Sequence, residues 1–229
     1  VFTKEEEAFL KQADVVVAAY DPSWAPLEYT DTETGMFSGV TSDLLSTFSR
    51  YTGLRFRFEP IDQAEALEKV KKGLIDMVCS VTGDYLWDER NKMYTTRYYL
   101  RAPTMLVRTK QPHTIERIAL QGGYWFSEHV AADHPGKEII FYKNVRECFD
   151  ALLKGDADAV YANVYVTNYL LTERRYESLA ATSMSKYTSE ICFGISKCAD
   201  PRLLSILDKC IQYTAPERMD ELVLKNTTK

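Results

Sequence analysis

The segments DQAEALEKVKKGLIDMV (residues 62–78) and NVRECFDALLKGDADAV (residues 144–160) follow one pattern. Each starts with Asp or Asn and carries a Glu three positions later, which predicts the capping box of a helix start. Apolar residues then recur at helical spacing. Gly73 or Gly155 can take the left-handed turn that ends a helix, and a short apolar run follows. The repeated order of helix, glycine and strand predicts two similar α/β units.

The residues before the first segment extend it into a layered unit. The apolar run Val15–Tyr20 predicts a strand that is buried on both faces. We expect a long loop over residues 21–39, a helix over 41–51 and a strand over 55–59. This β, α, β, α, β order requires a parallel sheet with crossover helices.

The second segment lies in a similar succession. We expect strands over residues 117–121, 138–142 and 157–161. We expect helices between and after them, from about residue 124, over 145–154 and over 164–172. A strand over 104–108 leads to the turn at Gln111-Pro112, and a strand over 191–196 precedes two closing helices, 200–213 and 216–225. The sequence thus predicts an α/β chain of two lobes, residues 1–108 plus 195–229 and residues 109–194. A cleft between two such lobes is a natural site for a small molecule.

The composition is that of an ordinary globular protein, with 45% hydrophobic and 27% charged residues. The net charge of −5 argues against nucleic acid as a partner, because phosphate binding needs a concentrated basic surface. No apolar run is long enough to cross a bilayer. The five cysteines show no zinc-like or C-x-x-C spacing, so we expect no metal, and one bridge among Cys192, Cys198 and Cys210 stays open. The abrupt start at Val1 is typical of a domain excised from a longer protein.

Several motifs appear together and in order. They are Asp21-Pro-Ser-Trp24-Ala-Pro26-Leu-Glu28-Tyr29, Gly39 with Asp43-Leu44-Leu45, Gly73-x-x-Asp76, Tyr94-Thr95-Thr96-Arg97-Tyr98-Tyr99, Gly155-x-Ala-Asp158 and Lys197-x-x-Asp200-Pro201-x-Leu203. Together they resemble the bacterial extracellular solute-binding proteins of family 3, the amino-acid-binding family, over nearly the whole chain. The resemblance implies a two-lobed Venus-flytrap fold (periplasmic binding protein type II). In that fold each lobe is a mostly parallel sheet flanked by helices, and two segments cross between the lobes.

The N-terminal stretch EEEAFLKQADVVVAAYDPSWAPLEY (residues 5–29) is most similar to the sensor modules of membrane-bound histidine kinases and diguanylate cyclases. The resemblance implies an extracytoplasmic domain, at the periplasm or outer surface, with a membrane tether elsewhere in the protein. It implies a small ligand such as an amino acid or another carboxylate, and no cofactor. It leaves dimerisation of the full-length receptor open.

The family places a ligand-stacking aromatic in the loop after the first strand, which here is Trp24. A flat indole offers burial and a cation–π face, although a Trp that only packs the loop is the alternative. Tyr20 shares this region, and we expect Asp21 to shape the turn and Glu28 to be solvated. Ser80 and Thr82 follow the next strand at its carboxyl end, where ligands of open α/β sheets bind. Hydroxyls that only satisfy the loop are equally consistent with that position.

Gly122, Gly123 and Tyr124 end a strand and open a helix, so exposed N–H groups there favour an anion. The resemblance implies carboxylate binding at this place, and a simple tight turn is the alternative.

Two departures from the family make a standard α-amino acid doubtful. Asp88 stands where amino-acid receptors carry a carboxylate-binding Arg. Arg90 is then the nearest candidate, unless it pairs with Asp88 or Glu89 at the surface. Asn163 stands near the place of the acidic residue that holds the ligand's ammonium group, and it could simply cap a helix.

We therefore expect a binding module and not an enzyme: a sensor domain that closes on a solute and passes that state to a membrane signalling protein. A transport receptor for an ABC importer is the nearest alternative. A cyclohexadienyl-dehydratase-like enzyme on the same fold would need a poised proton donor in the cleft, which no spacing singles out. A flytrap that signals through protein contacts alone is a further reading.

Overall fold

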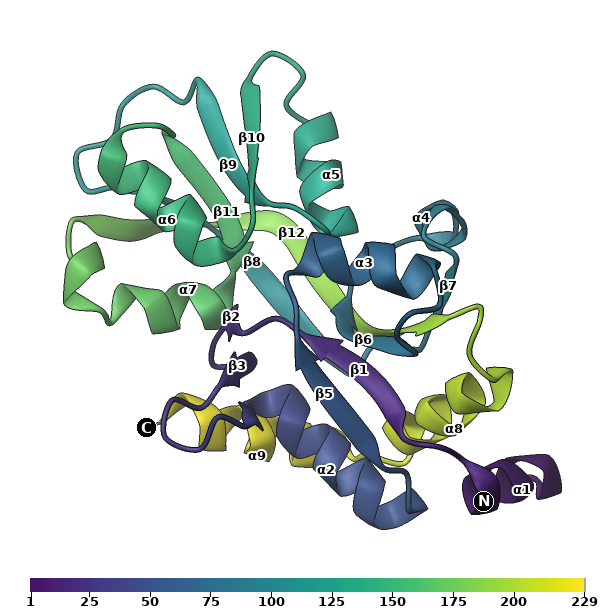
Figure 1. The fold of residues 1–229 in the computed structure, drawn as a ribbon. Coiled ribbons are helices and arrows are strands. Elements are labelled where there is room, and N and C mark those ends of the chain that lie inside the picture. The colour runs from purple at the N-terminus through teal and green to yellow at the C-terminus, as the bar shows by residue number, and fades with distance from the viewer. Residues whose placement is uncertain (229) are drawn as a thin grey trace.

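Two α/β lobes joined by two long strands make up the computed structural model, which describes residues 1–228 (Figure 1). Lys229, the last residue of the predicted first lobe, lies outside that range. The first lobe contains α1 (Lys4–Gln12), β1 (Val16–Tyr20), β2 (Ser23–Trp24), β3 (Glu28–Thr30), β4 (Phe37–Ser38), α2 (Val40–Thr52), β5 (Phe56–Pro60), α3 (Gln63–Lys71), β6 (Met77–Val81), α4 (Tyr85–Arg90), β7 (Met93–Thr95), α8 (Pro201–Gln212) and α9 (Pro216–Thr227). The second contains β9 (Arg117–Gln121), α5 (Trp125–Ala132), β10 (Glu138–Tyr142), α6 (Val145–Lys154), β11 (Ala159–Asn163), α7 (Val164–Leu171) and a 3₁₀ turn (Arg174–Tyr176).

The crossing strands are β8 (Leu100–Thr109) and β12 (Leu179–Ser196). They join the half-sheets into the order β10-β9-β11-β8-β12-β6-β1-β5, with β7 on β12. The pairs β1–β5, β1–β6, β9–β10 and β9–β11 are parallel, as the predicted crossover helices require. Because β8 and β12 run through both lobes, the lobe limits drawn from the sequence at residues 108 and 195 stay a prediction.

The two repeated segments fold as helix, glycine and strand, with different helix starts. Gly155 ends α6 at φ 77°, and Gly73 follows α3 at φ 72°. At the start of α6 the Asn144 side chain accepts from Glu147 N at 2.9 Å, whereas the Glu147 side chain accepts from Lys143 N and not from Asn144 N, so only one bond of the predicted capping box forms. The capping box predicted at Asp62 is wrong, because that side chain makes no cap hydrogen bond. Its carboxylate lies 3.3 Å from Lys143 Nζ of the second lobe instead.

Parts of the chain that show weak periodicity nevertheless form strands and helices. The long loop after β1 contains the small antiparallel sheet β2-β3-β4, and the stretch after β6 contains α4 and β7. Strand β12 starts at Leu179, well before the predicted residue 191, and it pairs with β8 as far as Ile191 before it continues beside β6 and β7. Its polar first half is held by ladder hydrogen bonds to β8, which a hydrophobicity pattern does not register.

The two crossing strands form an antiparallel ribbon that is irregular near its middle. The register shifts between Met184 and Thr188, opposite Met105 and Pro103. Pro103 has no backbone N–H to donate, so the ladder is interrupted on β8 as well.

One cluster of buried hydrophobic residues extends through both lobes, with Phe48 in the first and Phe149 in the second. All five cysteines are free thiols. Within residues 1–228, no helix combines the length and the hydrophobicity of a membrane span. The same residues bring no three His, Cys, Asp or Glu side chains together in a metal-binding group.

Candidate functional site

The carboxyl ends of the central strands of the two lobes face each other. Asp21 follows β1 and Ser80 lies near the end of β6, while Gln121 ends β9 and Asn163 ends β11. Parallel strands with crossover helices leave these ends as the open edge of each sheet, where ligands bind in such folds. The residues at this edge form the interlobe cleft.

An aromatic pair closes the centre of the cleft. The rings of Trp24 from the first lobe and Tyr124 from the second are stacked, with centroids 5.6 Å apart and planes at 21°. Both side chains are buried. The Tyr124 hydroxyl lies 3.2 Å from Ser80 Oγ, so one ring is both stacked and hydrogen-bonded across the cleft. Burial raises the pKa of Tyr124 well above its ordinary value, which keeps the phenol neutral.

A buried polar contact lies beside this pair. Gln121 Nε2 donates to Asp21 Oδ2 at 2.8 Å, and Ser23 N donates to the other carboxylate oxygen at 2.9 Å. Burial raises the pKa of Asp21 to about 6 in spite of these two donors. Asp21 therefore shapes its turn, as the sequence predicts, and also links the lobes.

Glu28 corrects the sequence interpretation, which placed it in solvent. Its side chain is fully buried, because β3 folds back under the loop and packs the carboxyl against the end of β1. Asp21 N donates to Glu28 Oε1 at 3.0 Å, and Oε2 has no hydrogen-bond partner within residues 1–228. Burial raises the pKa of Glu28 to about 8, so the side chain is mostly protonated at neutral pH.

The glycine turn before α5 packs against the other lobe. Gly123 has φ 90°, and a Cβ there would lie 2.7 Å from Gln63 Cγ and 2.8 Å from Ala64 N. The first turn of α3 thus occupies the space beside the predicted anion site. Gly122 is less constrained, since a Cβ would lie 3.7 Å from Tyr142 O, which is ordinary contact.

Contacts between charged and polar side chains continue at the rim. Arg90 Nη2 lies 2.9 Å from Glu128 Oε2 of α5, and Trp87 Nε1 donates to the same oxygen at 2.7 Å. Arg90 therefore bridges α4 to the second lobe and does not line the cleft cavity. Neither of its predicted surface partners, Asp88 or Glu89, is the partner in the structure. Both side chains of the Arg90–Glu128 pair are about half exposed, so its contribution to stability is small.

The cavity beside the aromatic pair has a volume of about 30 Å³. That volume holds one or two water molecules, whereas sites for small organic ligands have roughly 300–1,000 Å³. Of the predicted site residues, Trp24, Thr82, Tyr124 and Asn163 line it. Thr82 Oγ1 accepts from Phe126 N at 3.3 Å, and Asn163 Oδ1 caps α7 through Tyr165 N and Val166 N.

The remaining predicted residues lie elsewhere. Ser80 contacts the Tyr124 hydroxyl but does not line the cavity. Gly122 and Gly123 lie in the turn before α5. The Tyr20 ring stacks on Phe37 at 4.1 Å in the core of the first lobe, and its hydroxyl lies 2.6 Å from Thr30 Oγ1. Sequence reasoning missed Gln121 as a partner of Asp21 and the wall formed by Val145, Tyr161, Ser189 and Ile191. No local pattern marks these residues, because they meet only when the lobes pack.

The sequence profile described as bacterial extracellular solute-binding proteins, family 3, matches residues 16–223. The chain belongs to this family. No curated protein sequence matches the chain.

Solved structures with the same fold include both sensor and transport proteins. The periplasmic VFT2 domain of Bordetella pertussis BvgS has a TM-score of 0.86 at 19% identity, over 98% of each chain. A histidine kinase sensor domain similar to periplasmic binding proteins has a TM-score of 0.83 at 15% identity, over 95% of this chain and 97% of the other. The P235GK mutant of ArgBP from T. maritima has a TM-score of 0.80 at 16% identity, over 98% of this chain and 100% of the other. At these identities the likeness establishes the fold alone.

Proposed function

We propose that this chain is the extracytoplasmic sensing domain of a membrane-bound signalling protein and that its resting state is the closed one. The observation that carries the proposal is the cleft filled by the Trp24–Tyr124 stack, which leaves about 30 Å³. Membership of an extracellular solute-binding family and likeness to periplasmic and sensor domains support the location and the role. The membrane tether would lie outside these residues.

Closure here needs no solute, because direct contacts link the lobes. They are the Trp24–Tyr124 stack, the Gln121–Asp21 hydrogen bond and the Lys143–Asp62 ion pair. An aromatic pair contributes about 0.5–1.5 kcal/mol beyond its buried area, and a hydrogen bond to a charged group about 1.5–3 kcal/mol. These contributions are large enough to set a two-state equilibrium between lobes.

A solute could then act only by binding the open state. A ligand shifts an equilibrium through its preference for one state, and the cavity beside the aromatic pair has no room for an amino acid. In the open state Trp24 would offer a ring face, and Ser80 and Thr82 would offer hydroxyl groups to a small carboxylate. Opening, rather than closing, would be the change passed to the membrane protein.

The test combines small-angle scattering with a thermal-shift screen of amino acids, other carboxylates and aromatic amines. We expect the unliganded protein to be compact, and we expect Trp24→Ala to increase its radius of gyration. Tyr124→Ala removes the same stack and leaves the Trp24 ring in place, so any solute that binds the open state should bind this second variant more tightly, because the fraction of competent protein rises. A wild-type protein that is extended alone and becomes compact with solute would overturn the proposal.

Transport reception is the second candidate, favoured by likeness to a substrate-binding protein of an amino acid ABC transporter. Such a receptor must bind its solute in the wild-type form. Calorimetric titration with arginine and glutamine separates the two functions. Tight binding of either amino acid by the wild-type chain would favour transport, and its absence would favour sensing.

A further inference from the structure

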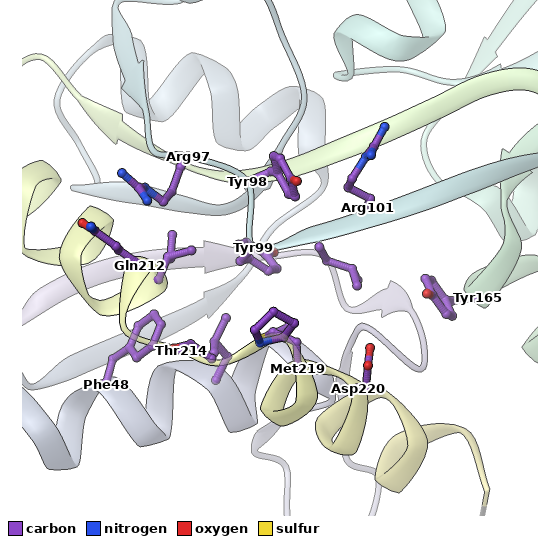
Figure 2. Close-up of a pocket in the computed structure, with 14 residues that line it drawn as sticks. Phe48, Arg97, Tyr98, Tyr99, Arg101, Tyr165, Gln212, Thr214, Met219 and Asp220 are labelled. Atoms are coloured by element: carbon purple, nitrogen blue, oxygen red, sulfur yellow. The ribbon is translucent and has the colours of Figure 1, made fainter.

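A second cavity, larger than the one in the cleft, lies beside the start of β8, between α2, α8 and α9 (Figure 2). Its volume is about 650 Å³, within the range of small-molecule sites. It shares no lining residue with the cleft cavity. Any ligand here would therefore occupy a site distinct from the one at the strand ends.

The floor of this cavity is apolar and held in place. Leu44 and Phe48 of α2 are buried there with Tyr99 and Ile211. Phe193 lies against both rings, stacked on Tyr99 at 4.5 Å and edge-on to Phe48 at 6.4 Å. The Tyr99 hydroxyl donates to Cys79 O at 2.8 Å, which fixes the ring. Such a preformed floor can bury an apolar group at little ordering cost.

One end of the cavity is cationic. The Arg97 side chain is exposed at the rim, and its guanidinium takes part in none of the ion pairs found within residues 1–228. Its backbone N–H donates to Asp208 Oδ1 at 2.7 Å, which anchors the residue. Arg101 lies across the cavity, on the side of Tyr165 (Figure 2). Its guanidinium lies over the Tyr98 ring at 5.9 Å and 3.7 Å from Glu190. Arg97 is therefore the cation that is available to an anion at this end.

The other end carries an acidic residue. Asp220 of α9 and Tyr165 of α7 lie there, away from Arg97 (Figure 2). Tyr165 belongs to the second lobe, so the cavity is lined by both lobes. Because Asp220 repels an anion and lies away from Arg97, an anionic group fits best beside Arg97.

We propose that this cavity binds a small organic anion, whose apolar body packs on Phe48 and Tyr99 and whose carboxylate or sulfonate pairs with Arg97. The proposal does not rest on the sensing function proposed above, and either can fail without the other. A carboxylate or a sulfonate suits the guanidinium, because two of its oxygens can accept two parallel hydrogen bonds. The volume of about 650 Å³ admits a body of two or three rings.

The experiment titrates the full chain with 1-anilinonaphthalene-8-sulfonate, followed by fluorescence, with uncharged N-phenyl-1-naphthylamine as the matched probe. Arg97→Gln should weaken binding of the sulfonate by about tenfold, because a charge-assisted hydrogen bond is lost. Asp220→Asn should strengthen it by about twofold, because a nearby like charge is removed. Neither change should alter binding of the uncharged probe. Arg57→Gln, at an exposed arginine of β5 outside the cavity, is the control for net charge.

Near-ultraviolet circular dichroism must show native packing in every variant, since the sulfonate also binds partly folded chains. Sulfonate binding that is unaffected by Arg97→Gln and Asp220→Asn would reduce the cavity to an apolar crevice and overturn the proposal. Release of the bound probe as the protein concentration rises, together with dimers in sedimentation, would show that a second copy of the chain occupies the cavity. That result would also overturn the proposal.

Discussion

Substitution of Gly123 by Ala should open the lobes. The new Cβ would lie 2.7 Å from Gln63 Cγ and 2.8 Å from Ala64 N, and the latter is backbone that cannot move aside cheaply. Overpacking of this kind costs about 1–3 kcal/mol. The clash exists only while α3 packs on the turn, so the ratio of closed to open protein should fall by about 5–150-fold.

The same substitution also strains the backbone, because Gly123 has φ 90°. A non-glycine residue in a left-handed conformation costs about 1–2 kcal/mol, and that cost applies to both states. Gly155→Ala is the matched control, since Gly155 has φ 77° and nothing within 4 Å of the added Cβ. It should lower the free energy of unfolding without changing lobe closure.

Small-angle scattering measures closure, and urea unfolding measures stability. We expect a larger radius of gyration for Gly123→Ala only, with a loss of stability in both variants. Equal radii for the wild type and Gly123→Ala would refute the inference that contact between α3 and this turn depends on glycine.

Two further predictions concern the cleft. Glu28 has a pKa of about 8 in the folded protein and an ordinary value of 4.5, so the folded state holds the proton more tightly. Its contribution to stability is therefore full below pH 4.5 and is lost as the pH rises to about 8, with a slope of at most about 1.4 kcal/mol per pH unit. Glu28→Gln should remove that slope in urea unfolding measured from pH 5 to 8, and an unchanged slope would show that Glu28 is not the titrating group. Arg90→Gln should lower the free energy of unfolding by less than about 1 kcal/mol, because its pair with Glu128 is half exposed. A loss above about 2 kcal/mol in the same assay would contradict the inference that Arg90 forms only a weak ion pair at the rim of the cleft.

The fold could be predicted because its signals are local. The helices that end at Gly73 and Gly155 combine 3.6-residue periodicity with a left-handed stop, and both are confirmed. The first half of β12 could not be found in this way. Its residues alternate weakly, and they are strand because β8 supplies hydrogen-bond partners from far along the chain.

The site is predicted less completely, for a related reason. The resemblance points to Trp24 and Tyr124, and the structure brings both into the cleft. It does not reveal that they stack on each other. Neither the Asp21–Gln121 hydrogen bond nor the burial of Glu28 has a local sequence signature. Asp21 and Gln121 belong to different lobes and meet only in the closed arrangement.

The β8–β12 ribbon has a mechanical consequence. Two strands bonded edge to edge resist shear and in-plane bending, yet they flex across their flat face where the ladder is broken. The register shift opposite Pro103 is such a break. Separation of the lobes should therefore follow a single preferred direction, in which the ribbon bends at this break.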